Sequence, residues 1–184
     1  VRSRALAEKK GLVFTYFVDI CHDHCIGDLL RLTKILENLL GNSIKFTPPG
    51  GRVSLTITEL PSGDGKRIGW YRYEIADTGV GIEKENLTHI FEPFYRTESS
   101  TISRTEGSGL GLSIVKNIID YKGGTIDVKS TPAKGTTFYV ELPIHFDDEQ
   151  AESPSADLRK EAASADFSGI KILLVEDNKI NQLI

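Results

Sequence analysis

The segment NLLGNSIKFT (38–47) carries the first residues whose types and spacing could do chemistry. On a helix that turns about 100° per residue, Asn38, Asn42 and Lys45 fall within roughly 60° of one another. Amide oxygens are suitable ligands for a hard cation such as Mg²⁺, and the Lys45 ammonium can meet a phosphate. An ordinary solvated helix face would show a similar pattern, so this segment alone leaves both interpretations open.

Two further segments add a base site and a phosphate site. DTGVGI (77–82) follows a predicted strand, so Asp77 can accept a hydrogen bond from an exocyclic amine. Gly79 and Gly81 allow a flat ring to approach the backbone, although a glycine-rich turn would also explain them. GSGLGL (107–112) opens a helix whose free N–H groups favour phosphate oxygens, with a flexible hinge as the alternative. The three segments together predict an ATP-binding domain.

Hydrophobic periodicity and turn residues predict the elements that must position these segments. A long helix begins at the N-cap Asp28 and ends before Pro48. The strand over 11–19 is almost wholly apolar, so we expect it to be buried on both faces. The remaining elements are the end of a helix over 1–10, a hairpin of 52–60 and 68–77, a short helix over 83–90, a mobile loop over 95–108, a helix over 109–124 and a closing hairpin of 125–130 and 136–143.

Composition and charge exclude several classes of function. The 184 residues carry a net charge of −4, with 39% hydrophobic residues and a mean hydropathy of −0.19. Residues 1–146 hold 18 Lys and Arg against 17 Asp and Glu, whereas 147–168 hold 2 against 7. This distribution shows no basic patch suited to nucleic acid, and the apolar stretch over 11–20 is too short to cross a membrane. Two cysteines make no disulfide framework, so we expect a cytoplasmic location.

The four motifs together resemble the catalytic ATP-binding domain of sensor histidine kinases. Residues 38–47 resemble its N box, 77–82 its G1 box, FEPF (91–94) its F box, and 107–112 its G2 box. The resemblance extends over roughly 3–143 and places the chain in the wider Bergerat-fold, or GHKL, family that includes gyrase B and Hsp90-type ATPases. It implies an α/β fold of the α+β type, a two-layer sandwich whose mixed, mostly antiparallel five-stranded sheet packs against three helices.

The resemblance also implies ATP and Mg²⁺ as ligands and a role for each motif. Asn38 and Asn42 would hold Mg²⁺ and the phosphates, Lys45 would bind a phosphate, and Asp77 would bind the adenine amine. Phe91 and Phe94 would anchor a lid, and Arg96 would reach the γ-phosphate. The other residues implied around the nucleotide are Gly79, Gly81, Ile82, Tyr95, Gly107, Ser108, Gly109, Leu110, Gly111 and Leu112.

The implied activity is transfer of the γ-phosphoryl group of ATP to a histidine on a separate dimerisation domain, in two-component signalling. A non-catalytic nucleotide-sensing module and a hydrolysing ATPase of the same family are the alternatives. In the ATPase relatives a glutamate activates water, and Asn38 takes that place here. Glu37 points about 100° away from Asn38 around the helix, so we expect negligible hydrolysis.

The same resemblance predicts the domain organisation. None of the four histidines, His22, His24, His89 and His145, lies in the family's phosphoacceptor context. We expect the end of a connecting helix over 1–10, the ATP-binding domain over 11–146, an acidic disordered linker over 147–168 and the start of a receiver domain over 169–184.

The receiver assignment and the partners depend on the end of the chain. KILLVEDN (171–178) resembles a first receiver strand, ending in Glu176 and Asp177. The parent is therefore expected to be a hybrid kinase, with a dimerisation domain and a receiver domain as partners. For residues 1–184 we expect no contact with nucleic acid or membrane. CHDHC (21–25) offers four zinc-ligand side chains, but their close spacing favours an ordinary loop.

Overall fold

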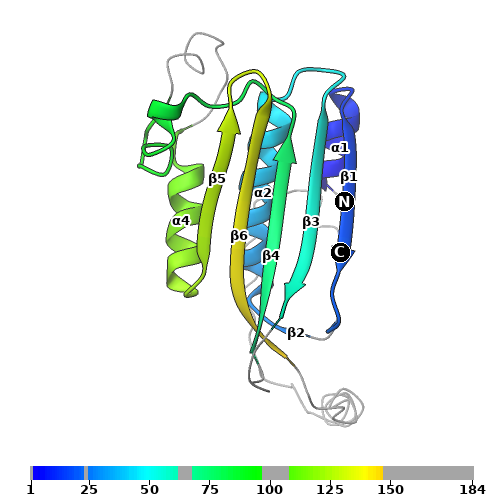
Figure 1. Ribbon diagram of the computed structural model, residues 1–184, viewed down its shortest axis with the longest axis vertical. Coiled ribbons are helices and arrows are strands. Elements are labelled where there is room, and N and C mark those ends of the chain that lie inside the picture. Colours follow the sequence, from blue (N-terminus) through cyan, green and yellow to red (C-terminus); the bar gives the residue numbers. More distant parts are fainter. Residues whose placement is uncertain (1, 23–24, 62–67, 97–107, 147–184) are drawn as a thin grey trace, which may run out of the picture. The chain divides into compact units, whose positions relative to one another are not determined.

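A sheet with helices on one face makes up the described part of the chain (Figure 1). The computed structural model describes residues 2–22, 25–61, 68–96 and 108–146, all within one compact unit, 1–148. The linker expected over 147–168, the receiver start expected over 169–184 and most of the expected lid lie outside these residues.

The sheet is mixed and mostly antiparallel, as predicted. β1 (Val13–Asp19) runs parallel to β3 (Arg52–Leu60), and β3 pairs antiparallel with β4 (Ile68–Asp77). β6 (Gly135–Phe146) lies antiparallel to both β4 and β5 (Thr125–Thr131). These five strands correspond to those expected from the sequence. A sixth, β2 (Cys25–Ile26), has two residues, pairs with the end of β6 and was not anticipated.

The helices are α1 (Arg2–Lys9), α2 (Leu29–Phe46) and α4 (Gly111–Tyr121). Asp28 is the N-cap of α2, as predicted, and its carboxylate accepts a hydrogen bond from the Arg31 N–H at 3.0 Å. The helix expected over 83–90 is shorter, a 3₁₀ turn η1 (Lys84–Asn86) whose N-cap makes no side-chain hydrogen bond. None of the described helices is long and apolar enough to span a membrane.

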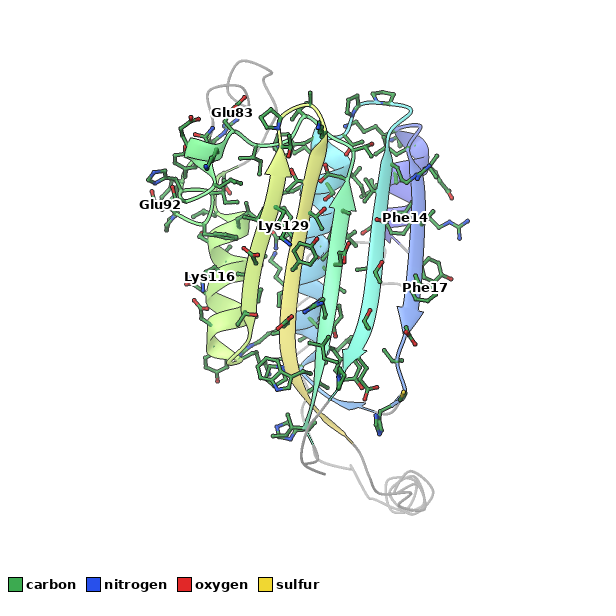
Figure 2. All side chains as sticks on the ribbon, in the orientation of Figure 1. Phe14, Phe17, Glu83, Glu92, Lys116 and Lys129 are labelled. Atoms are coloured by element: carbon green, nitrogen blue, oxygen red, sulfur yellow. The ribbon has the colours of Figure 1, made fainter. Side chains whose placement is uncertain are left out.

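The core lies between the helical layer and the inner face of the sheet. Ile35 and Leu39 of α2 are buried with Tyr73 and Ile75 of β4. The outer face of the sheet is turned toward the viewer in Figure 1 and carries charged side chains. On it Arg72 pairs with Glu141 at 2.6 Å. The Lys129 ammonium, labelled in Figure 2, lies 5.1 Å from the centre of the Tyr139 ring. One face of the sheet is therefore left to solvent, as in a two-layer sandwich.

The expectation that the first strand is buried on both faces is wrong. β1 is an edge strand, and Tyr16 and Phe17 are 67% and 62% exposed (Figure 2). Phe14 is the residue of this strand that packs on the core. A continuous apolar run is equally consistent with a central and an edge position, and α1 and α2 cover only part of the inner face of β1.

Candidate active site

The N, G1 and G2 segments meet at one end of the sheet. Figure 1 shows the end of β4, the last turn of α2, the first turn of α4 and the β5–β6 turn at the same end. The Val80 N–H donates to the Phe46 carbonyl at 3.2 Å, and the Ala133 N–H donates to the Val80 carbonyl at 2.8 Å. The segment 77–82 is therefore held between the end of α2 and the β5–β6 turn.

The glycines of this segment are required by the chain itself. A Cβ on Gly79 would lie 2.7 Å from the Phe46 carbonyl oxygen. Gly81 has a φ of +71°, and a Cβ there would lie 2.1 Å from the Thr131 carbonyl oxygen. The sequence left open whether these glycines serve a bound ring or a glycine-rich turn, and the structure packs both against the backbone of other segments. Ile82 is fixed beside them, since its N–H donates to Ser130 Oγ at 2.8 Å.

Asp77 ends β4 on the inner face of the sheet. One carboxylate oxygen, Oδ1, accepts hydrogen bonds from the Gly79 N–H at 2.9 Å and the Thr136 N–H at 3.2 Å. Burial raises the pKa of Asp77 above the usual value of 3.8, although these backbone donors and the nearby Ser43 hydroxyl oppose the rise. Both backbone hydrogen bonds go to the same oxygen, so the orientation of the carboxyl is fixed by the backbone.

Ser43 is a polar residue beside these segments that the sequence analysis did not single out. It is 1% exposed, and its hydroxyl has no hydrogen-bond partner among the described residues. The same hydroxyl lies close enough to the Asp77 carboxyl to lower its pKa. The available signal was spacing, because Ser43 follows Leu39 by four residues and Leu40 by three, which puts all three on one face.

The amide-bearing part of α2 faces the start of α4. Asn38 Nδ2 donates to the Lys34 carbonyl at 2.8 Å, and Oδ1 of the same side chain would lie 2.8 Å from a Cβ added to Gly111. The structure therefore brings the N and G2 segments into direct contact. Asn42 and Lys45 are half-buried further along α2, with the Lys45 ammonium 5.0 Å from the centre of the Phe46 ring.

The last turn of α2 is also capped from outside. Lys10 Nζ donates to the carbonyl oxygens of Ile44 at 2.8 Å and Lys45 at 2.7 Å. These acceptors are at the negative end of the helix dipole, where a cation is stabilising.

The two ends of the expected lid are pinned together. The Phe94 N–H donates to the Gly109 carbonyl at 3.0 Å, and a Cβ on Gly109, which has a φ of +73°, would lie 2.8 Å from the Phe94 carbonyl carbon. Phe91 packs half-buried on the core, but Phe94 is 71% exposed. Phe91 is therefore attached to the core by its ring, and Phe94 is attached to Gly109 by its backbone.

The other lid residues lie around this stem. The Tyr95 hydroxyl donates to Asn86 Oδ1 at 2.6 Å, and Arg96 is exposed. Ser108 Oγ accepts a hydrogen bond from the Leu110 N–H at 3.3 Å, and α4 begins without a side-chain cap. Leu112 follows in the first turn of α4 and is half-buried. Gly107 lies outside the described residues, together with the rest of 97–107.

Two shallow cavities of about 290 Å³ each are present in the described part. One lies beside Asp77 and is lined mainly by the β5–β6 hairpin, and the other lies between α2 and α4 around Tyr121. Neither is lined by Asn38, Asn42 or Lys45, so neither corresponds to a cleft for a whole nucleotide.

The first two residues of the CHDHC segment are hydrogen-bonded to Glu59 of β3. Glu59 accepts hydrogen bonds from the N–H groups of Cys21 at 2.7 Å and His22 at 2.9 Å, and its Oε1 lies 2.6 Å from His22 Nδ1. The described residues contain no group of three or more His, Cys, Asp or Glu side chains able to hold a metal ion, and Asp23 and His24 lie outside them. For His22 the geometry favours the loop interpretation.

Residues 27–145 match the family described as histidine kinase-, DNA gyrase B-, and HSP90-like ATPase. The chain belongs to this family. The expected two-layer sandwich with a mixed sheet and three helices is thereby confirmed as the fold of histidine kinase catalytic domains.

Curated relatives and solved structures indicate which branch of this family the chain resembles. The chain is 41% identical over 159 residues to the autoinducer 2 sensor kinase/phosphatase LuxQ of Vibrio parahaemolyticus, covering 85% of this chain and 18% of that protein. It is 34% identical over 182 residues to the virulence sensor protein BvgS of Bordetella bronchiseptica, covering 97% of this chain and 14% of that one. The chain thus spans less than a fifth of the length of these relatives.

Among solved structures, the mycobacterial sensor histidine kinase MprB matches with a TM-score of 0.63 and 29% identity, over 79% of this chain and 91% of that one. Full-length ShkA in complex with AMPPNP matches with a TM-score of 0.62 and 31% identity, over 78% of this chain and 29% of that one. The chain is therefore an ATP-binding catalytic domain of the sensor histidine kinase type.

Proposed function

We propose that this domain binds the magnesium complex of ATP and transfers its γ-phosphoryl group to a histidine on a separate phosphoacceptor domain. The proposal depends above all on one observation. The end of α2, the segment 77–82 and the start of α4 converge, with Asp77 half-buried at the start of that segment. The sensor-kinase relatives support the histidine as acceptor.

The adenine binds at Asp77 in this proposal. Two backbone N–H groups fix Oδ1, so the carboxylate is oriented before a nucleotide arrives. An ionised carboxylate only accepts hydrogen bonds, and it therefore selects a base that carries an amino group at this edge. Gly79, Gly81 and Ile82 supply the backbone beside the ring.

The triphosphate binds along the side of α2 that carries Asn38, Asn42 and Lys45. The two amide oxygens suit a hard cation, so they would hold Mg²⁺ together with phosphate oxygens. Bound there, Mg²⁺ supplies neutralisation of the triphosphate charge. Residues 1–146 carry almost balanced charge, so the remaining phosphate charge must be offset by groups close to it. These groups are the Lys45 and Arg96 side chains and the N–H groups at the uncapped start of α4.

In the transfer step an imidazole nitrogen of the acceptor histidine attacks the γ-phosphorus in line. The bond from that phosphorus to the β-phosphate bridging oxygen breaks, and ADP leaves. The contribution of this chain is to hold the phosphates in position and to offset their charge with Lys45 and Arg96. We propose a cytoplasmic location, since ATP and a receiver partner would both be available there.

The domain organisation belongs to the same proposal. Residues 1–10 are the end of a connecting helix, 11–146 the catalytic domain, 147–168 a linker and 169–184 the start of a receiver domain. The partners are accordingly a dimerisation domain that carries the acceptor histidine and a receiver domain in the same signalling chain.

Hydrolysis by water is not favoured by the side chains of α2. Asn38 cannot act as a general base, and its Nδ2 is engaged with the Lys34 carbonyl. Glu37 is exposed on a different side of the helix. ATP turnover by this domain alone should therefore be negligible, and turnover that Glu37→Ala abolishes would contradict the assignment.

The test is phosphorylation in trans. The chain is mixed with the phosphoacceptor domain of the same parent protein and γ-labelled ATP, and acid-labile, base-stable label on the acceptor is measured. We expect labelling that EDTA abolishes. Tight ATP binding without any labelling would instead assign a nucleotide-sensing module, and equal ATP affinity with and without EDTA would exclude the magnesium site.

A further inference from the structure

The edge strand β1 carries all the large apolar side chains that are exposed in the described strands. They are Val13, Tyr16, Phe17 and Val18, each between 47% and 67% exposed, and Phe17 is labelled at this edge in Figure 2. Edge strands are commonly protected from pairing with another strand by a lysine, a proline or a bulge. β1 has no lysine or proline and pairs with β3 without a bulge, so its outer side is unprotected.

The backbone of β1 can accept a further strand. The Val13 N–H donates to the Gly51 carbonyl at 2.9 Å, and the parallel register with β3 continues from there to the end of the strand. In such a ladder every second residue turns its N–H and carbonyl toward the neighbouring strand. The N–H and carbonyl groups of Phe14, Tyr16 and Val18 are therefore directed away from β3. Among the described residues no strand lies on that side.

We propose that β1 pairs antiparallel with β1 of a second copy of this chain, about a two-fold axis at Tyr16. In this register Tyr16 lies opposite Tyr16 of the second copy, and Phe14 lies opposite Val18 of the second copy. These residues carry the backbone groups that point away from β3, so each of those groups meets a partner across the axis. The two sheets become one continuous sheet.

The side chains of β1 complement one another in this register. Residues that face each other in an antiparallel pair lie on the same face of the sheet, where aromatic–aromatic and aromatic–β-branched pairs are stabilising. All five central pairs belong to these two types: Tyr16 with Tyr16, Phe14 with Val18 twice, and Thr15 with Phe17 twice. This self-complementarity favours a second copy over an unrelated strand as the partner.

Charge and neighbouring registers support the same axis. A centre one pair earlier would place Phe17 opposite Gly11, and a centre one pair later would place it opposite Asp19. With the centre at Tyr16, Asp19 lies opposite Val13, and the two Asp19 carboxylates are about 20 Å apart, six residues along a strand. Figure 1 shows α1 behind the first half of β1, so the two α1 helices would lie at opposite ends of the pair.

One strand pair buries less surface than the roughly 1,200 Å² of a stable interface, so we expect a reversible dimer. The test is analytical ultracentrifugation of the whole 184-residue chain from about 10 μM to 1 mM, a range suited to weak association. Wild type should shift from monomer to dimer across this range.

Tyr16→Lys and Tyr16→Glu each place like charges opposite one another at the axis. Each variant alone should raise the dissociation constant by at least about 30-fold, and an equimolar mixture of the two should form a dimer again. Tyr16 is mostly exposed, so the unfolding temperature at a concentration where all the chains are monomeric should stay unchanged. Tyr121→Lys is the matched control, because Tyr121 is 73% exposed on α4, and its dimerisation should equal that of wild type.

Disulfide trapping tests the register without a destabilising charge. In a background of Cys21→Ser and Cys25→Ser, Tyr16→Cys should cross-link to itself under mild oxidation, because facing Cα atoms about 5.5 Å apart suit a disulfide. Asp19→Cys should not cross-link to itself, but it should cross-link to Val13→Cys when the two variants are mixed.

Several results would overturn the proposal. They are a monomer at every concentration, a dimer that Tyr16→Lys leaves intact, a mixture of the two charged variants that stays monomeric, and Asp19→Cys that links to itself. The proposed function would stand in each case, since β1 carries none of the motif residues and phosphorylation in trans tests that function separately.

Discussion

The two ends of the proposed nucleotide site differ in how far the protein builds them in advance. At the base end, Asp77 is half-buried, but two backbone N–H groups hold its carboxylate, and Gly79 and Gly81 pack its turn against neighbouring backbone. At the phosphate end, Asn42 and Lys45 are half-buried, Arg96 is exposed, and the lid lies mostly outside the described residues.

This difference indicates how the affinity for ATP is divided between the base end and the phosphate end of the proposed site. A preformed base pocket gives a constant contribution, since its groups need no reordering when the ligand arrives. Long polar side chains and a lid must be ordered on binding, so the phosphate end contributes more variably and depends on the cation. Changes at the base end should therefore act under all conditions, and changes at the phosphate end only when Mg²⁺ is present.

The largest effect is expected for Asp77→Asn. The asparagine keeps an oxygen for the Gly79 and Thr136 N–H groups, so the fold should persist, but its amide would face the adenine amino group as a second donor. We expect ATP affinity to fall about 30- to 100-fold in calorimetric titration, both with Mg²⁺ and with EDTA. A loss confined to Mg²⁺ would mean that the base end is not where this residue acts.

Asn42→Ala should have a smaller and conditional effect. Removal of one amide oxygen weakens the cation site, so we expect about a 10-fold loss of affinity for Mg·ATP and almost none for ATP in EDTA. Asn117→Ala is the control, because Asn117 is an exposed asparagine of α4. An equal loss in EDTA would show that Asn42 binds the nucleotide without a cation.

Gly111→Ala tests the contact between the two helices. The added methyl group would lie 2.8 Å from Asn38 Oδ1, so the asparagine must move and ATP affinity should fall several-fold. Gly41→Ala is the matched change on α2, where a Cβ meets nothing within 4 Å. It should raise the free energy of unfolding by about 0.5–1 kcal/mol, as for glycine in a helix interior, and leave affinity unchanged. Unchanged affinity in Gly111→Ala would separate Asn38 from the site.

The smallest expected change near neutral pH is the change in ATP affinity caused by protonation of Asp77. Its pKa is raised by burial, so ATP affinity should begin to fall, as pH is lowered, at a higher pH than an ordinary aspartate would give. The sign is opposite for the nucleotide-free protein. A raised carboxyl pKa means that the fold favours the protonated form, so the contribution of Asp77 to the free energy of unfolding increases as pH falls through that pKa.

Titrations and denaturant unfolding across this range measure both trends, with Asp77→Asn as the control that should remove them. If ATP affinity and the free energy of unfolding both fell as the pH was lowered through this range, the Asp77 carboxyl would not be in a desolvating environment.

The sequence predicted elements and motifs well where local chemistry decides them. Asp28 as N-cap, Gly123 at the end of α4 and the hairpins follow from capping and turn preferences. It failed for β1, since burial depends on which neighbours cover a strand, and apolar composition does not record that. The roles of Gly79 and Gly81 could not be divided between ligand and chain, because the partner backbones of Phe46 and Thr131 are distant in sequence.

Ser43 marks the same limit within the site. Its neighbours on α2 identify a buried face, but only the fold brings Asp77 of β4 beside it. Tertiary contacts between segments more than thirty residues apart therefore decided what local patterns left open.

The Lys10 ammonium on the last carbonyls of α2 has a mechanical consequence. Lys10 directly follows α1, and Ala7 of α1 is fully buried in the same core. A displacement of α1 would therefore strain this clamp at the turn that bears Lys45 and Phe46. In the proposed function this turn binds phosphate, so the position of α1 would be coupled to nucleotide affinity.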